Sequence, residues 1–377
     1  MDRQSNIDHT LSTPRHRRET NVLPTPASRL DQWLTTLIAG AGSDLLLVPG
    51  ASPCIRLEGQ VRAIDGGILD GPEIESAVVP ALTPHGLLQY RESKIADCSY
   101  HLAGVGRFRI NLHRERGLAA AAIRALPAKI PSLAELRLPP SVEALSRLPR
   151  GLVLVGGPAG SGKSTTLAAL IDLINQRDAR HIITIEDPVE YEHIHSHSLV
   201  EQIEVGVDAP DFPTALRAAL RQAPDVIVVG EMRDPETIRI AVAAAETGHL
   251  VMSTLHTTDV ANTVSRISDS FPLERQNTIR QELAMALAAV LTQILLPTKN
   301  GDRIPAAELL MVGYGARQHI RRNSLQHLQQ EITITRNKGS FSLEESLGHL
   351  VQQGHIDREE GMVYANHPDD LNSQLRN

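Results

Sequence analysis

The sequence predicts an α/β protein, in which a mostly parallel sheet covered by helices on both faces follows a smaller α+β domain. Three observations lead to this prediction. Short apolar runs alternate with helical patterns after Arg150. A glycine-rich loop joins the first of these runs to a helix. Short strand-like segments separated by turn residues come before them. A length of 377 residues allows two domains of the usual size of about 100–200 residues.

The first part of the chain divides into a tail and a small domain. Residues 1–28 are polar and proline-bearing, with a basic run at Arg15–Arg18, and are predicted to be a disordered tail. The small domain is predicted to span residues 29–127. Its first helix has apolar residues at helical spacing from Leu30 to Leu37 and ends before Gly40. The expected strands are Leu45–Val48, Cys54–Leu57, Tyr100–Leu102, Phe108–Leu112 and Ala119–Ile123.

The second part begins after a proline-rich segment, residues 128–150, which we expect to be a linker with one short helix. Residues 151–366 are predicted to form the larger domain, followed by a polar tail at 367–377. From about Gln276 onward the pattern looks mostly helical. The expected buried strands are Leu152–Val155, Ile182–Ile185, Val226–Val229 and Leu250–Met252, and a helix is expected at Thr237–Thr247.

Composition narrows the possible function classes. The net charge of −7 argues against nucleic acid as the main partner, because phosphate binding needs a basic face. Two cysteines are too few for a disulfide framework or a four-cysteine zinc site. No apolar run reaches the roughly 20 residues of a membrane span, and the polar N-terminus lacks a signal-peptide pattern. We therefore expect a cytoplasmic protein.

A phosphate-binding loop is the strongest motif. The segment fits G-x-x-x-x-G-K-[ST] in full and follows a predicted strand. Small residues let backbone N–H groups turn toward a phosphate, and the next helix presents its positive end to the same anion. Lys163 is expected to reach the β- and γ-phosphates, and Ser164 to offer its hydroxyl to Mg²⁺. The loop is Gly157, Pro158, Ala159, Gly160, Ser161, Gly162, Lys163, Ser164 and Thr165.

Polar residues follow three of the later strands. Glu186 comes after Ile182–Ile185, Glu231 after Val226–Val229, and His256 soon after Leu250–Met252. Ligands of open α/β sheets bind at the carboxyl ends of the strands, so these side chains are expected beside the loop. One carboxylate can orient an attacking water, another can hold Mg²⁺, and a histidine can contact the γ-phosphate. A single acid at a strand end is explained equally well as a helix cap. Three polar strand ends beside a phosphate loop favour a nucleotide site.

Together these motifs resemble the Walker A, Asp, Walker B and His boxes of the secretion-superfamily ATPases, most closely the PilT-type retraction ATPases of type IV pili. The resemblance extends from about Leu30 to about Ile356. It rests on the glycine-rich loop, Ile183–Glu190, Arg221–Asp234 and Gly248–His256. It implies a RecA-like ATPase domain behind a PAS-like N-terminal domain. Two departures stand out, since Leu46 replaces a customary histidine and Gly315-Ala316-Arg317 replaces Ala-Ile-Arg.

By position, the resemblance assigns catalytic roles to individual residues. Glu186 would be the base that polarises water, Glu231 the carboxylate near Mg²⁺, shared with Ser164, and His256 the γ-phosphate contact. It also implies a homo-hexamer with ATP held between subunits, which makes Arg109, Arg114 and Arg124 of the first domain candidates to reach the nucleotide. Such a motor would act on an inner-membrane platform protein of the pilus machine and associate peripherally with that membrane.

Three interpretations remain open at this point. The first is a cytoplasmic motor that couples ATP hydrolysis to pilus retraction and twitching motility. The second is a pilus-assembly or type II/IV secretion ATPase of the same superfamily, which shares the nucleotide motifs but commonly has a longer N-terminal region and a tetracysteine motif. The third is a nucleotide-binding regulator or nucleic-acid translocase, which would need a basic groove or aromatic stacking surface that is not evident.

Overall fold

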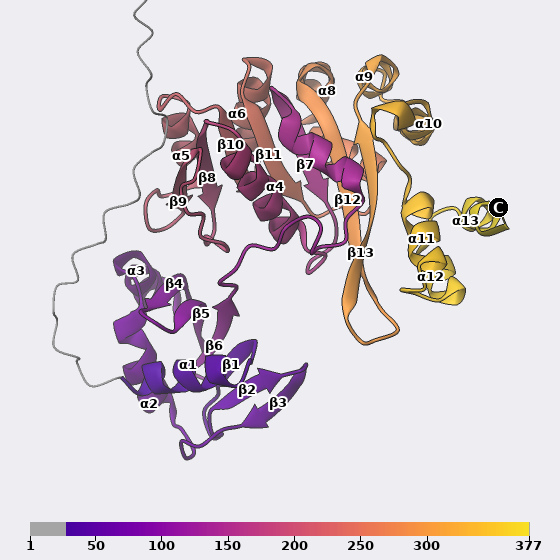
Figure 1. Cartoon of the computed structure of the whole chain (residues 1–377). Helices are drawn as coiled ribbons and strands as arrows, with labels where there is room; N and C mark the ends of the chain where they lie inside the picture. The colour runs from indigo at the N-terminus through magenta and orange to yellow at the C-terminus, as the bar shows by residue number, and fades with distance from the viewer. Residues whose placement is uncertain (1–27, 377) are drawn as a thin grey trace, which may run out of the picture. The chain divides into compact units, whose positions relative to one another are not determined.

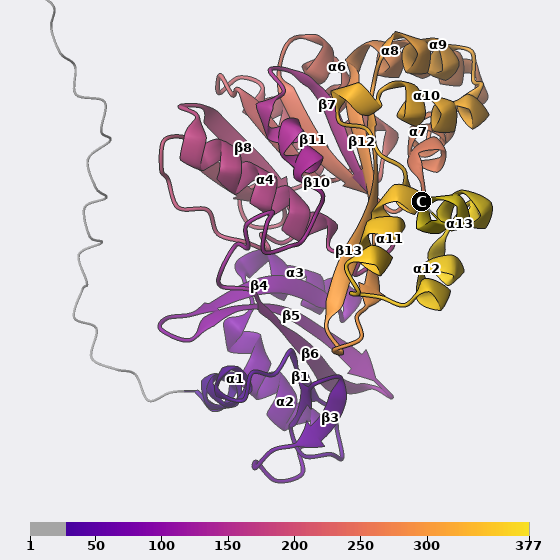
Figure 2. The same ribbon diagram turned by 45° about the vertical axis from the view of Figure 1, so that its right-hand side comes forward.

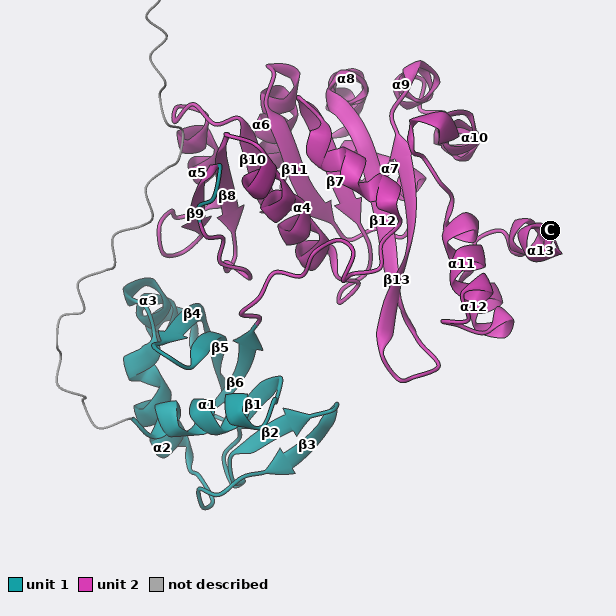
Figure 3. Ribbon diagram, viewed as in Figure 1, with its two compact units in different colours: residues 1–126, 195–197 teal, residues 127–194, 198–377 magenta. Residues whose placement is uncertain are grey.

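A computed structural model describes residues 28–376. These residues form two compact units, coloured separately in Figure 3. The first unit takes the residues up to Leu126 together with His195–His197, and the second takes the remainder. The predicted N-terminal tail lies outside the described residues except for Ser28, whose side chain caps the first helix. No helix of the described chain is long and apolar enough to cross a membrane.

In its described residues, the first unit is an antiparallel sheet with three α-helices and the short 3₁₀ helix Val79–Ala81. Six strands of the described chain pair in the order β3-β2-β1-β6-β5-β4. All five predicted strands and the first predicted helix are present, so the α+β expectation is confirmed. The core uses mainly aliphatic side chains, as expected for a chain with few aromatics. The strands are β1 (Asp44–Leu47), β2 (Cys54–Leu57), β3 (Gln60–Ala63), β4 (Ala96–Leu102), β5 (Gly106–Glu115) and β6 (Leu118–Leu126), with helices α1 (Arg29–Ala39), α2 (Gly71–Val78) and α3 (Pro84–Ser93).

The second unit contains a larger sheet in the order β13-β12-β7-β11-β10-β8-β9 (Figure 1). Every neighbouring pair is parallel except β12 and β13, which are antiparallel. The predicted α/β class is therefore confirmed. The strands are β7 (Gly151–Gly156), β8 (His181–Glu186), β9 (Leu199–Glu204), β10 (Val226–Glu231), β11 (Leu250–Leu255), β12 (Leu287–Pro297) and β13 (Arg303–Met311).

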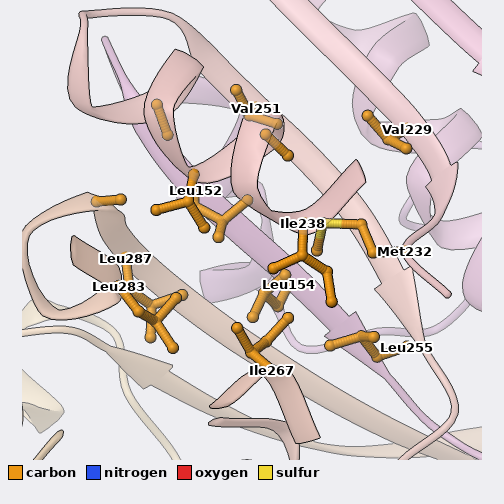
Figure 4. Close-up of a cluster of buried hydrophobic side chains, with 14 of the residues drawn as sticks. Leu152, Leu154, Val229, Met232, Ile238, Val251, Leu255, Ile267, Leu283 and Leu287 are labelled. Carbon is orange, nitrogen blue, oxygen red and sulfur yellow. The ribbon is translucent and has the colours of Figure 1, made fainter. Parts of the chain in front are cut away.

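Helices cover both faces of this sheet, and alternate side chains of β7 pack into the core on each face. Leu152 and Leu154 point into one core with α5 (Phe212–Ala219), α6 (Pro235–Glu246), α7 (Val260–Asp269) and α8 (Leu273–Ala286), part of which Figure 4 shows. Val153 and Val155 point into the opposite core with α4 (Lys163–Arg177). Alternate side chains of a strand face opposite sides of a sheet, so a strand buried on both faces must be apolar throughout.

Part of the segment expected to be a linker, residues 128–150, is packed into the second unit. It contains the 3₁₀ helix Pro140–Arg147. Leu138, Val142 and Leu145 are buried in the same core as α4. The prolines therefore interrupt regular structure here without removing the segment from the core.

The expectation of a mostly helical C-terminal third is wrong for β12 and β13. Both strands are apolar for most of their length and buried on both faces, and such runs lack the alternation that marks a half-buried strand. The helices follow afterwards: α9 (Tyr314–Arg321), α10 (Leu328–Ile334), α11 (Leu343–Gln352), α12 (Arg358–Tyr364) and α13 (Pro368–Arg376), with short 3₁₀ turns at Leu325–His327 and Arg336–Lys338.

The segment expected to be a polar tail, residues 367–377, contains α13. Leu371 of this helix is fully buried against Leu347 and Leu350 of α11. The same small core includes Leu296 of β12 and Ile304 of β13. Figures 1 and 2 both show α11 lying beside β13. Leu371, with Leu375 beside it, thus attaches this polar helix to the small core shared by α11, β12 and β13.

Glu308 of β13 is a buried acid, with only 3% of its surface exposed. Its Oε1 accepts a hydrogen bond from the Val260 backbone N–H at 3.2 Å, at the start of α7. Burial, opposed by that hydrogen bond and reinforced by the nearby charges of Glu344 and Asp259, raises the pKa of Glu308 to about 7. The folded protein therefore holds this carboxyl in its protonated form over a wider pH range than the unfolded chain does.

This raised pKa predicts a pH-dependent stability. Between the ordinary glutamate value of 4.5 and about 7, unfolding releases the Glu308 proton, so the free energy of unfolding should fall as pH rises. The contribution approaches about 1.4 kcal/mol per pH unit. Glu308→Gln keeps the acceptor for Val260 and should flatten this slope in urea unfolding across that window. Glu359→Gln, at an exposed position of α12, is the control. Equal slopes for wild type and Glu308→Gln would contradict the assignment.

Candidate active site

The candidate site lies at one edge of the large sheet. Strands β7, β8, β10 and β11 are parallel, so their carboxyl ends meet there. The glycine-rich loop follows β7, while Glu186 and Glu231 are the last residues of β8 and β10. His256 directly follows β11. Lys163 Nζ is 3.5 Å from His256 Nδ1, and His256 Nε2 is 3.9 Å from a Glu231 oxygen. The structure therefore brings these predicted residues together.

The loop owes its shape to glycines. Gly160 and Gly162 have φ angles of 73° and 88°, in the left-handed region that other residues adopt at a cost. A side chain at Gly157 would place its Cβ 2.4 Å from both the Gln293 carbonyl oxygen and Ser161 Oγ. Helix α4 then begins at Lys163 without a capping side chain. The first N–H groups of a helix that lacks such a cap are suited to bind an anion.

Lys163 is buried, with its ammonium turned into the loop. Its Nζ donates to the carbonyl oxygens of Gly157 and Pro158, each at 2.9 Å. Burial lowers the Lys163 pKa, while the charges of Glu231 and Glu190 act in the opposite direction. Ser164 is exposed beside it, and the Thr165 hydroxyl lies 3.0 Å from that of Tyr191. The cation thus lies inside the loop that would surround a phosphate.

Glu186 is held by hydrogen bonds from three directions. Thr184 Oγ1 and Gln202 Nε2 donate to its Oε1 at 2.8 and 3.2 Å, and the Glu190 N–H donates to Oε2 at 3.3 Å. Burial raises the pKa of Glu186, and these hydrogen bonds oppose that shift. A carboxylate that is fixed in orientation and poorly solvated is a better proton acceptor than one in water, which suits a base that polarises water.

Glu231 has different neighbours. Its carboxylate forms an ion pair with Arg233 and lies near His256. Burial, followed by the charge of Lys163, lowers the pKa of His256 and favours its neutral form. The carboxylate of Glu231 and the hydroxyl of Ser164 are hard oxygen donors of the kind Mg²⁺ prefers. The donor chemistry at this edge therefore fits the expected metal.

The three candidate arginines lie in the other compact unit. Arg109 Nε is 3.6 Å from Asp97, and Arg124 Nε is 2.9 Å from Asp44. Arg114 pairs with Glu75 at 2.8 Å and lies over the ring of Tyr90. Arg109 and Arg124 are also direct partners across β5 and β6. Within its own unit each arginine is therefore paired with a carboxylate. None of these contacts involves a residue of the glycine-rich loop.

Several residues that support the site escaped the sequence analysis. Gln202 connects Glu186 to the Tyr191 carbonyl oxygen, to which it donates at 2.8 Å. Gln293 of β12 contacts the loop through Ser161 and the following helix α4 through Thr166. One sign was available for Gln293, because an amide inside an otherwise apolar strand must find hydrogen-bond partners.

Comparisons with known proteins identify the family and the fold of the chain. Residues 130–362 match the family model described as type II/IV secretion system protein. The type IV pilus retraction ATPase PilT of Pseudomonas aeruginosa is 40% identical over 329 residues, covering 87% of this chain and 96% of that protein. A twitching motility protein of Neisseria gonorrhoeae is 42% identical, covering 81% and 82% respectively. A crystal structure of the pilus retraction motor PilT with bound ADP superposes with a TM-score of 0.83 at 41% identity, covering 92% of this chain and 99% of that one.

Removal of the Lys163 ammonium provides the first test of the site. Lys163→Ala should lower the steady-state ATP hydrolysis rate by about a hundred- to a thousandfold, because the cation offsets charge that develops on the transferred phosphoryl group. Lys299→Ala is the matched control, since Lys299 pairs with Asp357 at 2.6 Å and has no contact with the loop. Wild-type rates in purified Lys163→Ala would show that the loop is not the catalytic phosphate site.

Proposed function

The chain belongs to the type II/IV secretion system protein family, whose members are P-loop ATPases, and from that premise we propose that it is the motor of type IV pilus retraction. It is itself a nucleotide-binding ATPase with a RecA-like fold. The observation that carries the proposal is the extent of the likeness to PilT, which spans both compact units and goes beyond the nucleotide motifs. Twitching motility is the cellular behaviour that retraction would drive.

Binding of ATP follows from the geometry of the loop. The N–H groups around Gly160 and at the start of α4 surround the phosphates, and Lys163 exchanges its carbonyl acceptors for phosphate oxygens. That exchange is favourable because hydrogen bonds between two charged groups are stronger than those to neutral carbonyls. The Ser164 hydroxyl and the Glu231 carboxylate would hold Mg²⁺, which would supply further positive charge at the phosphates.

Hydrolysis requires a water molecule directed at the γ-phosphorus. Glu186 accepts a hydrogen bond from this water and takes its proton as the new oxygen–phosphorus bond forms. The bond between the γ-phosphorus and the bridging oxygen breaks, leaving ADP and phosphate. His256, whose lowered pKa favours the neutral form and whose Nδ1 is 3.5 Å from Lys163 Nζ, would donate a hydrogen bond to a γ-phosphate oxygen. Loss of that contact after hydrolysis gives the protein a means of distinguishing ATP from ADP.

The assembly belongs to this proposal as well. The motor would be a cytoplasmic homo-hexamer that engages the inner-membrane platform protein of the pilus and has no nucleic-acid partner. In such a ring, an arginine from a neighbour's first unit would complete the site. Guanidinium groups suit this role because their planar fork meets phosphate oxygens with two hydrogen bonds. Arg109, Arg114 and Arg124 would then exchange their carboxylate partners for phosphate at one stage of the cycle.

Deletion of the gene tests whether the motor retracts the pilus, assembles it or serves in export. Cells that lack a retraction motor should carry more surface pili than wild type and should not twitch, which electron microscopy and a surface-motility assay measure. Expression of the wild-type chain should restore both, and Lys163→Ala should not. Bald cells would point to an assembly ATPase instead, and normal pili with a secretion defect to an export ATPase.

Mixing variants tests the shared site. Lys163→Ala and Arg109→Ala homo-oligomers should each be nearly inactive, whereas a mixture should recover part of the ATPase activity because some interfaces pair an intact loop with an intact arginine. Arg62→Ala, on the exposed strand β3 of the same unit, is the control and should be active alone. Lack of recovery in rings shown to be mixed would place Arg109 outside a shared site.

A further inference from the structure

Gln293 is a buried amide in the strand next to the phosphate loop. It lies in β12 with 3% of its surface exposed. Strand β12 pairs in parallel with β7, and its preceding residue Thr292 is the register partner of Gly156. Gln293 is therefore level with the point where β7 continues into the loop. An amide buried in this way is costly unless its donors and its acceptor are paired.

Both ends of the Gln293 amide are paired with the loop and its helix. Nε2 donates to the Ser161 carbonyl oxygen at 2.6 Å, and Oε1 accepts from Thr166 Oγ1 at 2.8 Å. Ser161 lies within the loop, and Thr166 lies in the first turn of α4. A single side chain from a distant part of the sequence thus connects the middle of the loop to the helix that follows it.

The loop glycines pack against this same residue. A Cβ at Gly157 would lie 2.4 Å from the Gln293 carbonyl oxygen, and a Cβ at Gly162 would lie 3.2 Å from its Nε2. The loop is therefore in close contact with both the backbone and the side chain of Gln293. The need for glycine at these two positions arises in part from β12, as well as from their φ angles of 152° and 88°.

The hydrogen bond to Ser161 also orients a peptide group. In a trans peptide the C=O and the following N–H point in opposite directions. The Ser161 carbonyl is directed at Gln293, so the Gly162 N–H is directed away from it. A loop binds an anion through N–H groups that are turned toward the anion.

We propose that Gln293 is a positioning residue for phosphate binding, whose amide holds the loop in its anion-accepting conformation without touching the nucleotide. The inference rests on the nucleotide site of the proposed function and adds a residue to it. Without the amide, the peptide between Ser161 and Gly162 is free to rotate. Its N–H then no longer has a fixed direction when ATP arrives, and part of the binding energy is spent on ordering the loop.

Two substitutions at Gln293 separate positioning from packing. Gln293→Met keeps the volume and removes both hydrogen bonds, so the Kd of a fluorescent ATP analogue and the KM for ATP should rise about tenfold while kcat changes far less. In Gln293→Glu, only the protonated acid both donates to Ser161 and accepts from Thr166. Its affinity relative to wild type should therefore recover as pH is lowered from about 9 to about 6.

A double-mutant cycle supplies an independent measurement. Thr166→Val removes one of the two hydrogen bonds and should raise the Kd by a smaller factor than Gln293→Met does. Combined with Gln293→Met it should add little, because the two residues act through one interaction. Leu296→Ala is the control in the same strand, since its side chain is buried in the core with α11 and should lower the Tm without changing the Kd.

The outcomes distinguish this inference from the function on which it rests. If Lys163→Ala loses binding while Gln293→Met binds as wild type and Gln293→Glu shows no pH dependence, Gln293 has no positioning role and the nucleotide site stands. If the effects of Gln293→Met and Thr166→Val on the Kd are additive in the double variant, the positioning role is likewise overturned. If Lys163→Ala itself binds the analogue as wild type does, the nucleotide site has been misassigned and the proposed function fails with it.

Discussion

The parallel pairing of β7, β8, β10 and β11 is the constraint on which the rest of the structure depends. Each strand delivers its last residues to the same edge, so a phosphate loop, two carboxylates and a histidine from separate parts of the sequence become neighbours. The pairing is stable because each strand is mostly apolar and has a buried middle portion. The candidate catalytic residues therefore lie where these mostly apolar strands end and the chain leaves the buried sheet.

Charged groups at this edge are already satisfied by protein partners. Lys163 is held by two carbonyl oxygens, Glu186 by three donors and Glu231 by Arg233. In the proposed function, a bound nucleotide would replace some of these protein partners with phosphate oxygens. The same residues would then meet different partners at each stage of hydrolysis. The two carboxylates differ in environment, since Glu186 accepts three hydrogen bonds and Glu231 pairs with Arg233, and this difference would suit the separate roles proposed for them.

Local sequence was enough to predict the loop and the strand ends, because glycine spacing and short apolar runs are encoded within a few residues. Such patterns predict the first helix, around Leu30, and the strands that come before and after the loop in the sequence. Strands β12 and β13 could not be distinguished from helices, since burial on both faces removes the alternation that identifies a strand. The packed segment near Val142 and the helix around Leu371 depend on contacts with distant residues, which composition does not reveal.

The supporting residues of the site were harder to predict for the same reason. Gln293 meets Ser161 across 132 residues, and Gln202 meets Glu186 across 16. Neither belongs to a spacing motif, and each acquires its role only when strands pair. The candidate arginines are the opposite case. Their suitability for phosphate binding can be recognised from the sequence alone, but in the structure each is paired with a carboxylate within its own unit.

The claim most central to this account is that Glu186 performs the chemistry at a site that Lys163 and the loop create for binding. Glu186→Gln tests it directly, because the amide keeps the shape and loses the charge that takes the proton from water. The measurement compares the Kd for ATP with the rate of phosphate release in the purified full chain. The account predicts nearly unchanged affinity and a fall in rate of about a hundredfold or more. Equal losses of affinity and rate, or an unchanged rate, would contradict it.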